Sequence, residues 1–258
     1  MSIRINELSS YLENVIPSSL SCEWDNDGVM VCSDTEASVN RILLTLDVTM
    51  EALRFAKQQN CDTVISHHPL IFKPIRALTS GTPSTDAALY AVQNSINVLS
   101  YHTRLDALPV YGVNDTLSDL LEMNNGQAFG PEGEEIGRIG VLEKSHEFDT
   151  FCEFVKNKLG VSTLITVDSG REVHKLAMIG GDGKDYLIPA IKAGADTFLT
   201  GRCGYNLDID AAYYGINVIE AGHYNTEAPV LKSLEKLISR EYAEFEILFY
   251  HSDRTKAV

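Results

Sequence analysis

A repeated segment constrains the fold of this chain more than any other feature of its sequence. Residues 60–66 return as residues 194–200, and both copies place an Asp-Thr pair ahead of an apolar run. The strand expected at residues 42–46 returns as residues 176–180 with the same spacing to that run. Strands that alternate with helical patterns are typical of β-α-β units and a mainly parallel sheet. The sequence therefore predicts an α/β fold with two similar lobes.

The boundary between the lobes is expected in residues 124–137, a stretch rich in Gly and Glu. We predict a discontinuous first lobe of residues 1–125 plus 218–258. The second lobe is then residues 126–217.

Composition narrows the class of protein. The net charge of −15 argues against a nucleic-acid partner, because phosphate binding needs a basic surface. Five cysteines without a C-x-x-C pair indicate reduced thiols rather than a disulfide framework. The sequence has no run of 18 apolar residues and no apolar signal region, so we expect a cytoplasmic protein that does not bind or cross a membrane.

Polar residues gather at the expected carboxyl ends of the strands, where open α/β sheets bind ligands. His67 and His68 follow the strand in residues 62–66, and Pro69 stops the chain from continuing as a helix. A later strand leads to His102 and Asp106, and its counterpart in the second half leads to His223 and Glu227. These two segments share a His-x-x-x-carboxylate pattern.

Imidazoles and carboxylates without cysteine suit Zn, Mn, Fe, Co or Ni. Five ligands exceed the three usual for one catalytic zinc, and two carboxylates can bridge ions, so the set fits a dinuclear centre. The ligand set is His67, His68, Asp106, His223 and Glu227, with His102 in reserve. Taken singly, each is also an ordinary turn or helix-capping residue. Their recurrence at matching strand ends favours a metal site.

Two polar loops allow alternative interpretations. The cluster Asp25-Asn26-Asp27 beside Trp24 is either turn chemistry or a set of ligands. The loop at residues 180–184 is either a phosphate site or a simple strand-to-helix turn, because it lacks the spacing of a Walker loop.

Several segments resemble the Nif-three-like family, the GTP cyclohydrolase type 2 homologues that include YbgI-like proteins. The resemblance covers most of the chain and is carried by Trp24-Asp25-Asn26-Asp27-Gly28, Leu46-Asp47-Val48-Thr49, Ser66-His67-His68-Pro69-Leu70-Ile71-Phe72, His102 to Asp106, Gly112-Val113-Asn114-Asp115 and Gly222-His223-Tyr224-Asn225-Thr226-Glu227. It implies two α/β lobes with two divalent metal ions in the cleft between them, and a homohexamer. The implied metal ligands are His67, His68, Asp106, His223 and Glu227.

The resemblance implies a metal-dependent hydrolase, similar to a GTP cyclohydrolase that opens the guanine imidazole ring, acting on a nucleotide or another anionic small molecule. His102 is the candidate proton shuttle, and a role in orienting Asp106 is the alternative. The alternative function is a non-catalytic metal-binding scaffold, or a metal-storage or regulatory protein acting through protein partners.

The chain departs from the family pattern after Thr200-Gly201. Arg202 and Asn206 stand where the family often has an acidic residue and a histidine. An arginine there favours an anionic substrate group, since its guanidinium matches phosphate and carboxylate, or it forms a surface ion pair.

Overall fold

The computed structural model describes residues 3–255, which divide into two units. Unit 1 consists of the described residues up to Leu105 together with Leu231–Arg254, and unit 2 contains Asp106–Val230. These breaks differ from the boundaries predicted after residues 125 and 217. Helix α5 (Val113–Leu120) buries Leu117 in the core of unit 2, and β12 (Asn217–Glu220) is a strand of the unit 2 sheet.

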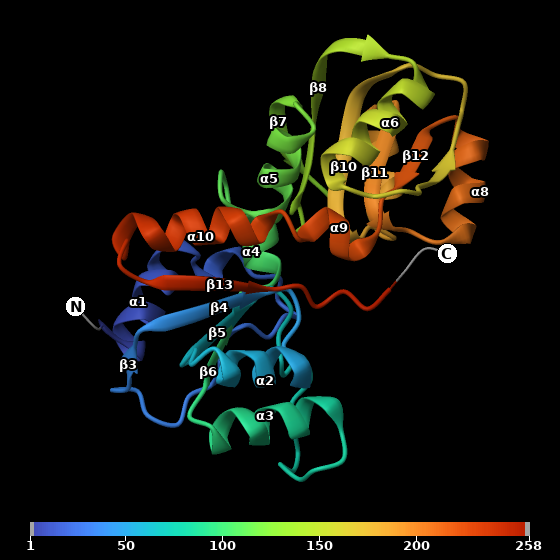
Figure 1. Cartoon of the computed structure of the whole chain (residues 1–258). Helices are drawn as coiled ribbons and strands as arrows, with labels where there is room; N and C mark the ends of the chain where they lie inside the picture. Colours follow the sequence, from blue (N-terminus) through green and yellow to red (C-terminus); the bar gives the residue numbers. More distant parts are fainter. Residues whose placement is uncertain (1–2, 256–258) are drawn as a thin grey trace. The chain divides into compact units, whose positions relative to one another are not determined.

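A five-stranded mixed sheet forms the centre of unit 1, in the order β13-β4-β5-β6-β2 (Figure 1). The strands β13, β4, β5 and β6 are parallel, and β2 runs antiparallel to β6. The central strands are buried on both faces, as continuous apolar runs predict. The sheet strands are β2 (Gly28–Val31), β4 (Arg41–Thr45), β5 (Thr63–Ser66), β6 (Asn97–Ser100) and β13 (Glu246–Tyr250).

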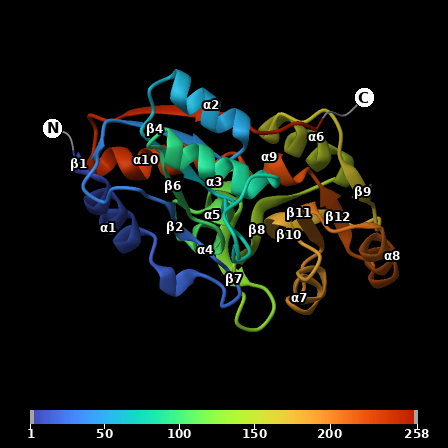
Figure 2. The ribbon, with the colours of Figure 1, turned by 90° about the horizontal axis from the view of Figure 1, so that it is seen from below.

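Helices cover both faces of the unit 1 sheet. The helices α2 and α3 pack on one face, while α1 and α10 lie on the other (Figure 2). Thr49 and Thr82 cap α2 and α3 by accepting backbone N–H groups of the first turn. The helices and small elements are β1 (Ile3–Arg4), α1 (Ile5–Val15), η1 (Ser18–Leu20), β3 (Ser38–Val39), α2 (Met50–Gln58), α3 (Pro83–Gln93) and α10 (Val230–Glu241).

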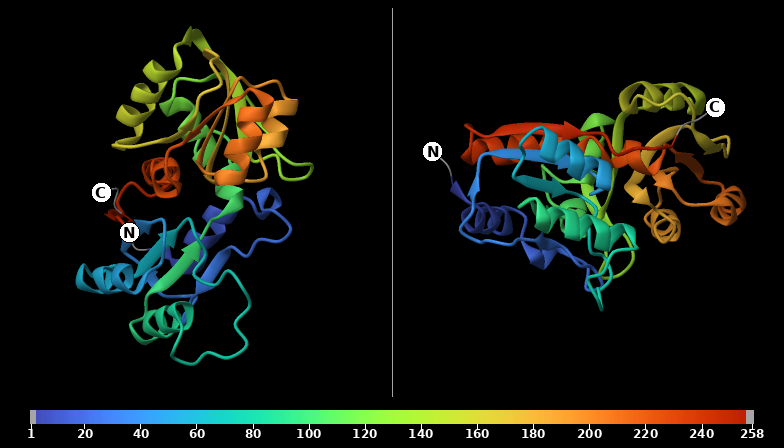
Figure 3. Two further views of the ribbon diagram at one scale, coloured as in Figure 1. Left: turned by 90° about the vertical axis from the view of Figure 1, so that its right-hand side faces the viewer. Right: turned by 60° about the horizontal axis from the view of Figure 1, so that its bottom comes forward.

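Unit 2 is built around a six-stranded mixed sheet in the order β7-β8-β10-β11-β12-β9. Its parallel centre is β10-β11-β12, flanked by antiparallel neighbours. The helices α5 and α6 cover one face and α7 and α8 the other (Figure 3). The remaining elements are β7 (Asn124–Phe129), β8 (Gly137–His146), α6 (Phe148–Leu159), β9 (Ile165–Val167), β10 (Val173–Asp182), α7 (Leu187–Lys192), β11 (Thr197–Arg202) and α8 (Tyr205–Tyr214), with the short helix α9 (His223–Glu227). The short helix α4 (Thr103–Ala107) contains the break between the two units.

The sequence repeat corresponds to the same arrangement of strands in the two units. In each, three equivalent parallel strands are followed in the sheet by an antiparallel strand. The order is β4-β5-β6-β2 in unit 1 and β10-β11-β12-β9 in unit 2. Even single hydrogen bonds recur. The backbone N–H of Asn97 donates to Asp62 O at 2.8 Å, and that of Asn217 donates to Asp196 O at 2.9 Å.

The α/β prediction is confirmed. The prediction of a mainly parallel sheet is correct for unit 1, where only the pairing of β2 with β6 is antiparallel. It is wrong for unit 2, where three of the five strand pairings are antiparallel. Strand β7 begins inside the stretch expected to be a boundary loop and pairs with β8. Strand β13 was not predicted, and its parallel pairing with β4 is a contact between distant parts of the chain. Within residues 3–255, none of the helices has the length and apolarity needed to span a membrane. The cytoplasmic location stays a prediction.

Candidate metal centre

Three histidines of unit 1 come together at the carboxyl ends of β5 and β6. One ligand nitrogen from each of His67, His68 and His102 lies within 4.8 Å of the others. The ring centroids of His67 and His68 are 4.9 Å apart, and those of His67 and His102 are 5.3 Å apart. Adjacent side chains can share this site because β5 ends at Ser66, before the alternation of a strand would separate them.

Each of these rings is held by an oxygen acceptor at Nδ1. His67 donates to the carbonyl oxygen of Tyr101 at 3.0 Å, and His68 donates to Asp47 Oδ1 at 2.8 Å. Ser252 Oγ donates in turn to Asp47 Oδ2 at 2.6 Å. A proton on Nδ1 fixes the neutral tautomer in which Nε2 is the ligand atom, the arrangement usual for metal-binding histidines.

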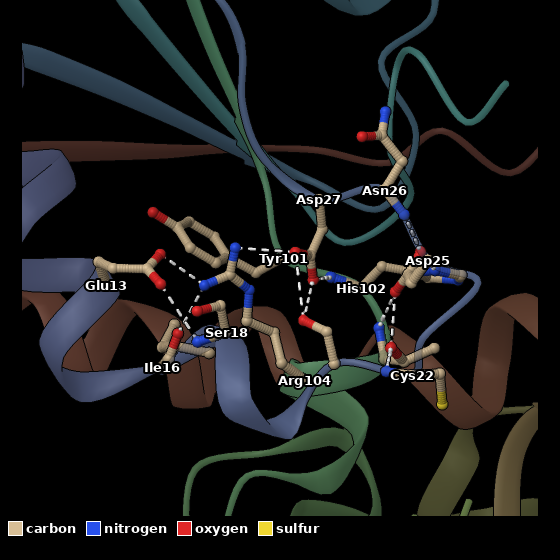
Figure 4. A network of polar contacts seen from close by, with 12 residues as sticks. Glu13, Ile16, Ser18, Cys22, Asp25, Asn26, Asp27, Tyr101, His102 and Arg104 are labelled. Carbon is tan, nitrogen blue, oxygen red and sulfur yellow. Dashed lines mark hydrogen bonds and ion pairs between the residues drawn. The ribbon is translucent and has the colours of Figure 1, made fainter. Parts of the chain in front are cut away.

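His102 is oriented by a fully buried carboxylate (Figure 4). Its Nδ1 donates to Asp25 Oδ1 at 2.8 Å, while Thr103 donates to Asp25 Oδ2 through both its backbone N–H and its hydroxyl. Burial alone would raise the pKa of the Asp25 carboxyl, but these hydrogen bonds outweigh it and hold that pKa well below its usual range. Asp25 therefore stays ionised and keeps His102 in one orientation.

A buried arginine holds the segment that carries Asp25. Arg104 donates to Glu13 Oε2 at 2.6 Å and to the Ile16 carbonyl at 2.9 Å, and it pairs with Asp27 Oδ1 at 2.8 Å (Figure 4). Burial would lower the pKa of Arg104, but its two carboxylate partners raise it. The cluster at residues 25–27 thus supports His102, and Asp27 anchors the loop.

In unit 2 the candidate ligands lie on one short helix. His223 and Glu227 stand one turn apart on α9, with Nε2 and Oε1 3.2 Å from each other. Glu227 is buried, whereas about half of the His223 side chain is exposed. Thr226 fixes this helix to the sheet, because its Oγ1 accepts the backbone N–H of Gly181 at 3.0 Å.

Two glycines leave room for that helix. A Cβ atom at Gly181 would overlap Glu227 Oε1 and would lie 3.2 Å from His223 Nε2. A Cβ atom at Gly201 would lie 2.5 Å from the Gly181 carbonyl and 2.7 Å from His223 Cα. Neither position tolerates a side chain without moving α9. The glycines on β10 and β11 therefore make room for the side chains of His223 and Glu227.

The donor set of each unit suits a divalent transition metal. Unit 1 offers three imidazoles with fixed tautomers, and unit 2 offers an imidazole and a carboxylate in a glycine-lined seat. Such mixed nitrogen and oxygen ligands fit Zn, Fe, Mn, Co or Ni.

The other predicted site residues lie in unit 2. Asp106 is on α4 with 8 % of its surface exposed, and its carbonyl accepts from Asn114 Nδ2 at 3.3 Å. Arg202 is the last residue of β11 and its side chain is exposed. Asn206 lies in the first turn of α8. Whether Asp106 binds metal and Arg202 binds substrate stays a prediction.

Sequence reasoning placed Asp47 at a strand end and Asp25 in a polar cluster, but it gave neither residue a role in supporting the histidines. Asp47 had a signal, because it ends a buried strand just as His67 does, and Asp25 belonged to a polar loop with two interpretations. Ser252 gave no signal at all, since only the folded chain places it beside Asp47. The register also shows that the His-x-x-x-carboxylate echo is displaced by one position. His223 is the first residue of α9, whereas His102 precedes the equivalent helix α4.

A second group of side chains in unit 2 has the composition of a metal site, but its glutamate accepts hydrogen bonds from the backbone. Ligand atoms of Cys203, Asp208 and Glu220 lie within 4.8 Å of one another. Glu220 Oε1 accepts the backbone N–H groups of Cys203 and Gly204 at 2.7 and 2.8 Å. Burial, together with the two carboxylates, raises the pKa of the Cys203 thiol, so the protonated form is favoured. We assign no site there.

The chain is similar in sequence to known proteins over nearly its whole length. It is 34% identical over 244 residues to a Clostridium acetobutylicum protein named GTP cyclohydrolase 1 type 2 homolog, covering 92% of this chain and 90% of that one. A Lactococcus lactis protein of the same name is 30% identical over 241 residues, covering 92% of each.

Solved structures share the fold. Reduced HcgD from Methanocaldococcus jannaschii superposes with a TM-score of 0.85 at 28% identity, covering 96% of this chain and 98% of that one. The Staphylococcus aureus hypothetical protein SA1388 superposes with a TM-score of 0.87 at 24% identity over 100% of both chains, which shows the fold alone. The family model described as Duf34/NIF3 (NGG1p interacting factor 3) matches residues 3–256. The resemblance drawn from the sequence is thus confirmed, and the chain belongs to the DUF34/NIF3 family.

Proposed function

We propose that the protein is a metal-dependent hydrolase with a dinuclear centre that acts on an anionic small molecule. The proposed ligands are His67, His68, Asp106, His223 and Glu227. The observation that carries the proposal is the histidine cluster of unit 1, in which all three Nδ1 atoms donate to an oxygen acceptor. Ordinary surface histidines have no need of such fixed tautomers.

When bound, divalent ions of this type polarise a substrate oxygen and lower the pKa of water. The residues of this chain contribute orientation and proton transfer. Asp25 holds the Nδ1 proton of His102, so Nε2 is the nitrogen that accepts or returns a proton during the reaction. In this proposal His102 is the proton shuttle.

A cavity of about 520 Å³ in unit 1 supports a small-molecule substrate. Its lining includes Asp47, His68 and Arg54, together with Pro69 and Ser84. That volume is typical of sites for small ligands. The relatives are named GTP cyclohydrolase 1 type 2 homolog, so opening of the guanine imidazole ring of GTP is the first reaction to test.

Metal content is the first prediction. Elemental mass spectrometry of the purified protein should find one to two transition-metal ions per chain. The double variant His67→Ala/His68→Ala should lose most of that metal. The matched control is His174→Ala, which removes an exposed histidine on β10 and should keep the metal. Wild-type metal in the double variant would refute the assignment of these ligands.

Catalysis is tested separately, by a substrate screen with metal-loaded protein. The screen covers GTP, other nucleotides, phosphoesters and cyclic amides. Turnover of a nucleotide that disappears in the double variant supports the hydrolase. A metal-loaded protein that turns over none of these classes favours the non-catalytic scaffold instead. We further propose a homo-oligomer, a hexamer by resemblance, which sedimentation analysis of the same sample tests.

Arg202 is proposed to bind the anionic part of the substrate. Its side chain is exposed at the end of β11, and no ion pair of Arg202 was found among residues 3–255. A guanidinium is always charged and offers two parallel donors to a phosphate or carboxylate. Its contribution would be positioning rather than proton transfer.

Replacement of Arg202 by alanine should therefore raise KM by about tenfold on the best anionic substrate, with a smaller change in kcat and unchanged metal content. Arg171→Ala is the control, because Arg171 is also exposed but donates to the Gly215 carbonyl. Unchanged kinetics in Arg202→Ala would exclude this role. Lost metal would instead indicate that Arg202 neutralises carboxylates.

A further inference from the structure

Two exposed aromatic rings flank the histidine cluster of unit 1. Trp24 is 52% exposed and Phe72 is 43% exposed. Their ring centroids lie 6.1 Å apart in an edge-to-face arrangement. Each ring also stands edge-to-face to His102, at 6.2 Å for Trp24 and 6.0 Å for Phe72. Three nearly perpendicular rings thus meet beside the candidate metal ligands.

The two aromatic residues come from separate loops that are fastened to each other. Asn26 Nδ2 donates to the carbonyl oxygen of Ile71, which ties the loop after η1 to the loop after β5. The backbone N–H of Asn26 also donates to Asp25 Oδ1 at 2.8 Å, and this carboxylate orients His102. The loops that carry the two rings are therefore joined by a hydrogen bond close to both rings, although the rings themselves are partly exposed.

This preorganisation distinguishes the pair from scattered apolar residues on the surface. A lone exposed aromatic ring needs no explanation, but two rings in edge-to-face contact, on loops joined by a hydrogen bond next to reactive groups, are suited to form a binding surface. Perpendicular rings suit a flat ligand, because a ring stacked on one partner meets the other edge-to-face.

We propose that Trp24 and Phe72 form a stacking platform that binds a planar heteroaromatic ring, such as a purine base, of the substrate. The proposal rests on the proposed hydrolase function and names the substrate class of that site. It adds that the planar ring lies against Trp24 and Phe72, next to the proton-transferring His102. The platform determines specificity and takes no part in bond breaking.

The sequence offers a direct readout, because Trp24 is the only tryptophan of the chain. Metal-loaded protein is titrated with guanosine, ribose 5-phosphate or tetramethylammonium chloride while tryptophan emission is recorded. Free N-acetyltryptophanamide corrects for absorption by guanosine. We expect saturable quenching by guanosine only. Comparable saturation by ribose 5-phosphate or by the ammonium ion would overturn the planar-ring assignment.

Phe72→Ala should weaken guanosine binding by about tenfold, because stacking on one aromatic side chain contributes on that order. Phe72→Tyr keeps a ring and should retain the wild-type affinity. Tyr213→Ala removes a ring that is 84% exposed on α8 and is the matched control, expected to bind guanosine normally. Equal guanosine affinity in Phe72→Ala and wild-type protein would overturn the platform.

These outcomes are separate from those of the hydrolase proposal, because quenching needs no turnover. Guanosine binding that depends on Phe72, in a protein that hydrolyses nothing, supports the platform and refutes the hydrolase. Hydrolysis of a substrate without a planar ring, together with no guanosine quenching, refutes the platform and leaves the hydrolase intact. Metal analysis of Phe72→Ala, expected to match the wild type, excludes an indirect effect through lost ligands.

Discussion

The two sheets share three adjacent parallel strands and an antiparallel neighbour, but the proposed metal ligands are placed at their strand ends in different ways. In unit 1 the strand end itself carries the ligands, since His67 and His68 directly follow β5. At the equivalent positions in unit 2 stand Gly201 and Arg202. There the proposed ligands lie on α9. Gly181 and Gly201, on β10 and β11, have no side chain and so leave room for this helix. The equivalent strand ends therefore need residues of different size. Unit 1 has histidines there, whereas unit 2 has a glycine that leaves room for α9.

This difference predicts unequal effects of alanine on stability at equivalent positions. Gly201→Ala should destabilise the protein by about 1–3 kcal/mol, because the added Cβ meets the Gly181 carbonyl and the backbone of α9. Thermal unfolding should show a drop in Tm of roughly 5 °C. His67→Ala, at the matching position of unit 1, should lower Tm far less in metal-free protein. A Tm of Gly201→Ala equal to the wild-type value would mean that α9 does not need this seat.

A smaller effect is expected from the carboxylate that supports His102. Asp25→Asn keeps the size of the side chain but loses the charge-assisted acceptor of the His102 Nδ1 proton. Because His102 lies against the proposed ligands His67 and His68, a displaced His102 should also disturb the metal site. Metal affinity should fall about 10- to 100-fold, as measured by competition with a chelator. Asp86→Asn, an exchange at the first turn of α3, is the control. In unit 2, Gly181 stands at the position equivalent to Asp47, the other supporting carboxylate.

Unchanged metal affinity in Asp25→Asn, together with a large loss of kcat, would distinguish the role of His102 from that of the metal ligands. It would assign His102 to proton transfer alone and leave the metal to the remaining ligands. Nitrogen chemical shifts of His102 give an independent readout, since the Nδ1-protonated tautomer should be lost or mixed in the variant.

The smallest effect on stability is expected at the end of β6 in unit 1 and of the equivalent β12 in unit 2. Strand β6 ends in Ser100, whereas β12 ends in Glu220. Burial, aided by Glu220, raises the pKa of Asp208 above its ordinary value of 3.8. The ionised Asp208 therefore destabilises the folded state above its raised pKa, and this cost disappears as the pH falls below 3.8. Asp208→Asn should give a small rise in Tm at neutral pH and none in strong acid. A fall in Tm at neutral pH would indicate that a cation balances the two carboxylates.

Much of the fold was predictable because local patterns agree with the final structure. The apolar runs of the parallel strands, the repeat and helix α6 are encoded within short stretches, and α6 has the bounds that its pattern predicts. The histidines and their place at strand ends were also readable, because open α/β sheets present their carboxyl ends to ligands. The family follows from motifs, which need no structure.

Other features depend on contacts between residues far apart in the sequence. Strand β13 exists because the end of the chain returns to pair with β4, and Ser252 reaches Asp47 for the same reason. Asp25 orients His102 only once the chain has folded, since no local pattern links a polar loop to a strand end so distant along the chain. The sequence by itself determined which residue types could bind metal. Only the tertiary structure decided which carboxylates hold the imidazoles, because hydrogen bonds depend on distance in space.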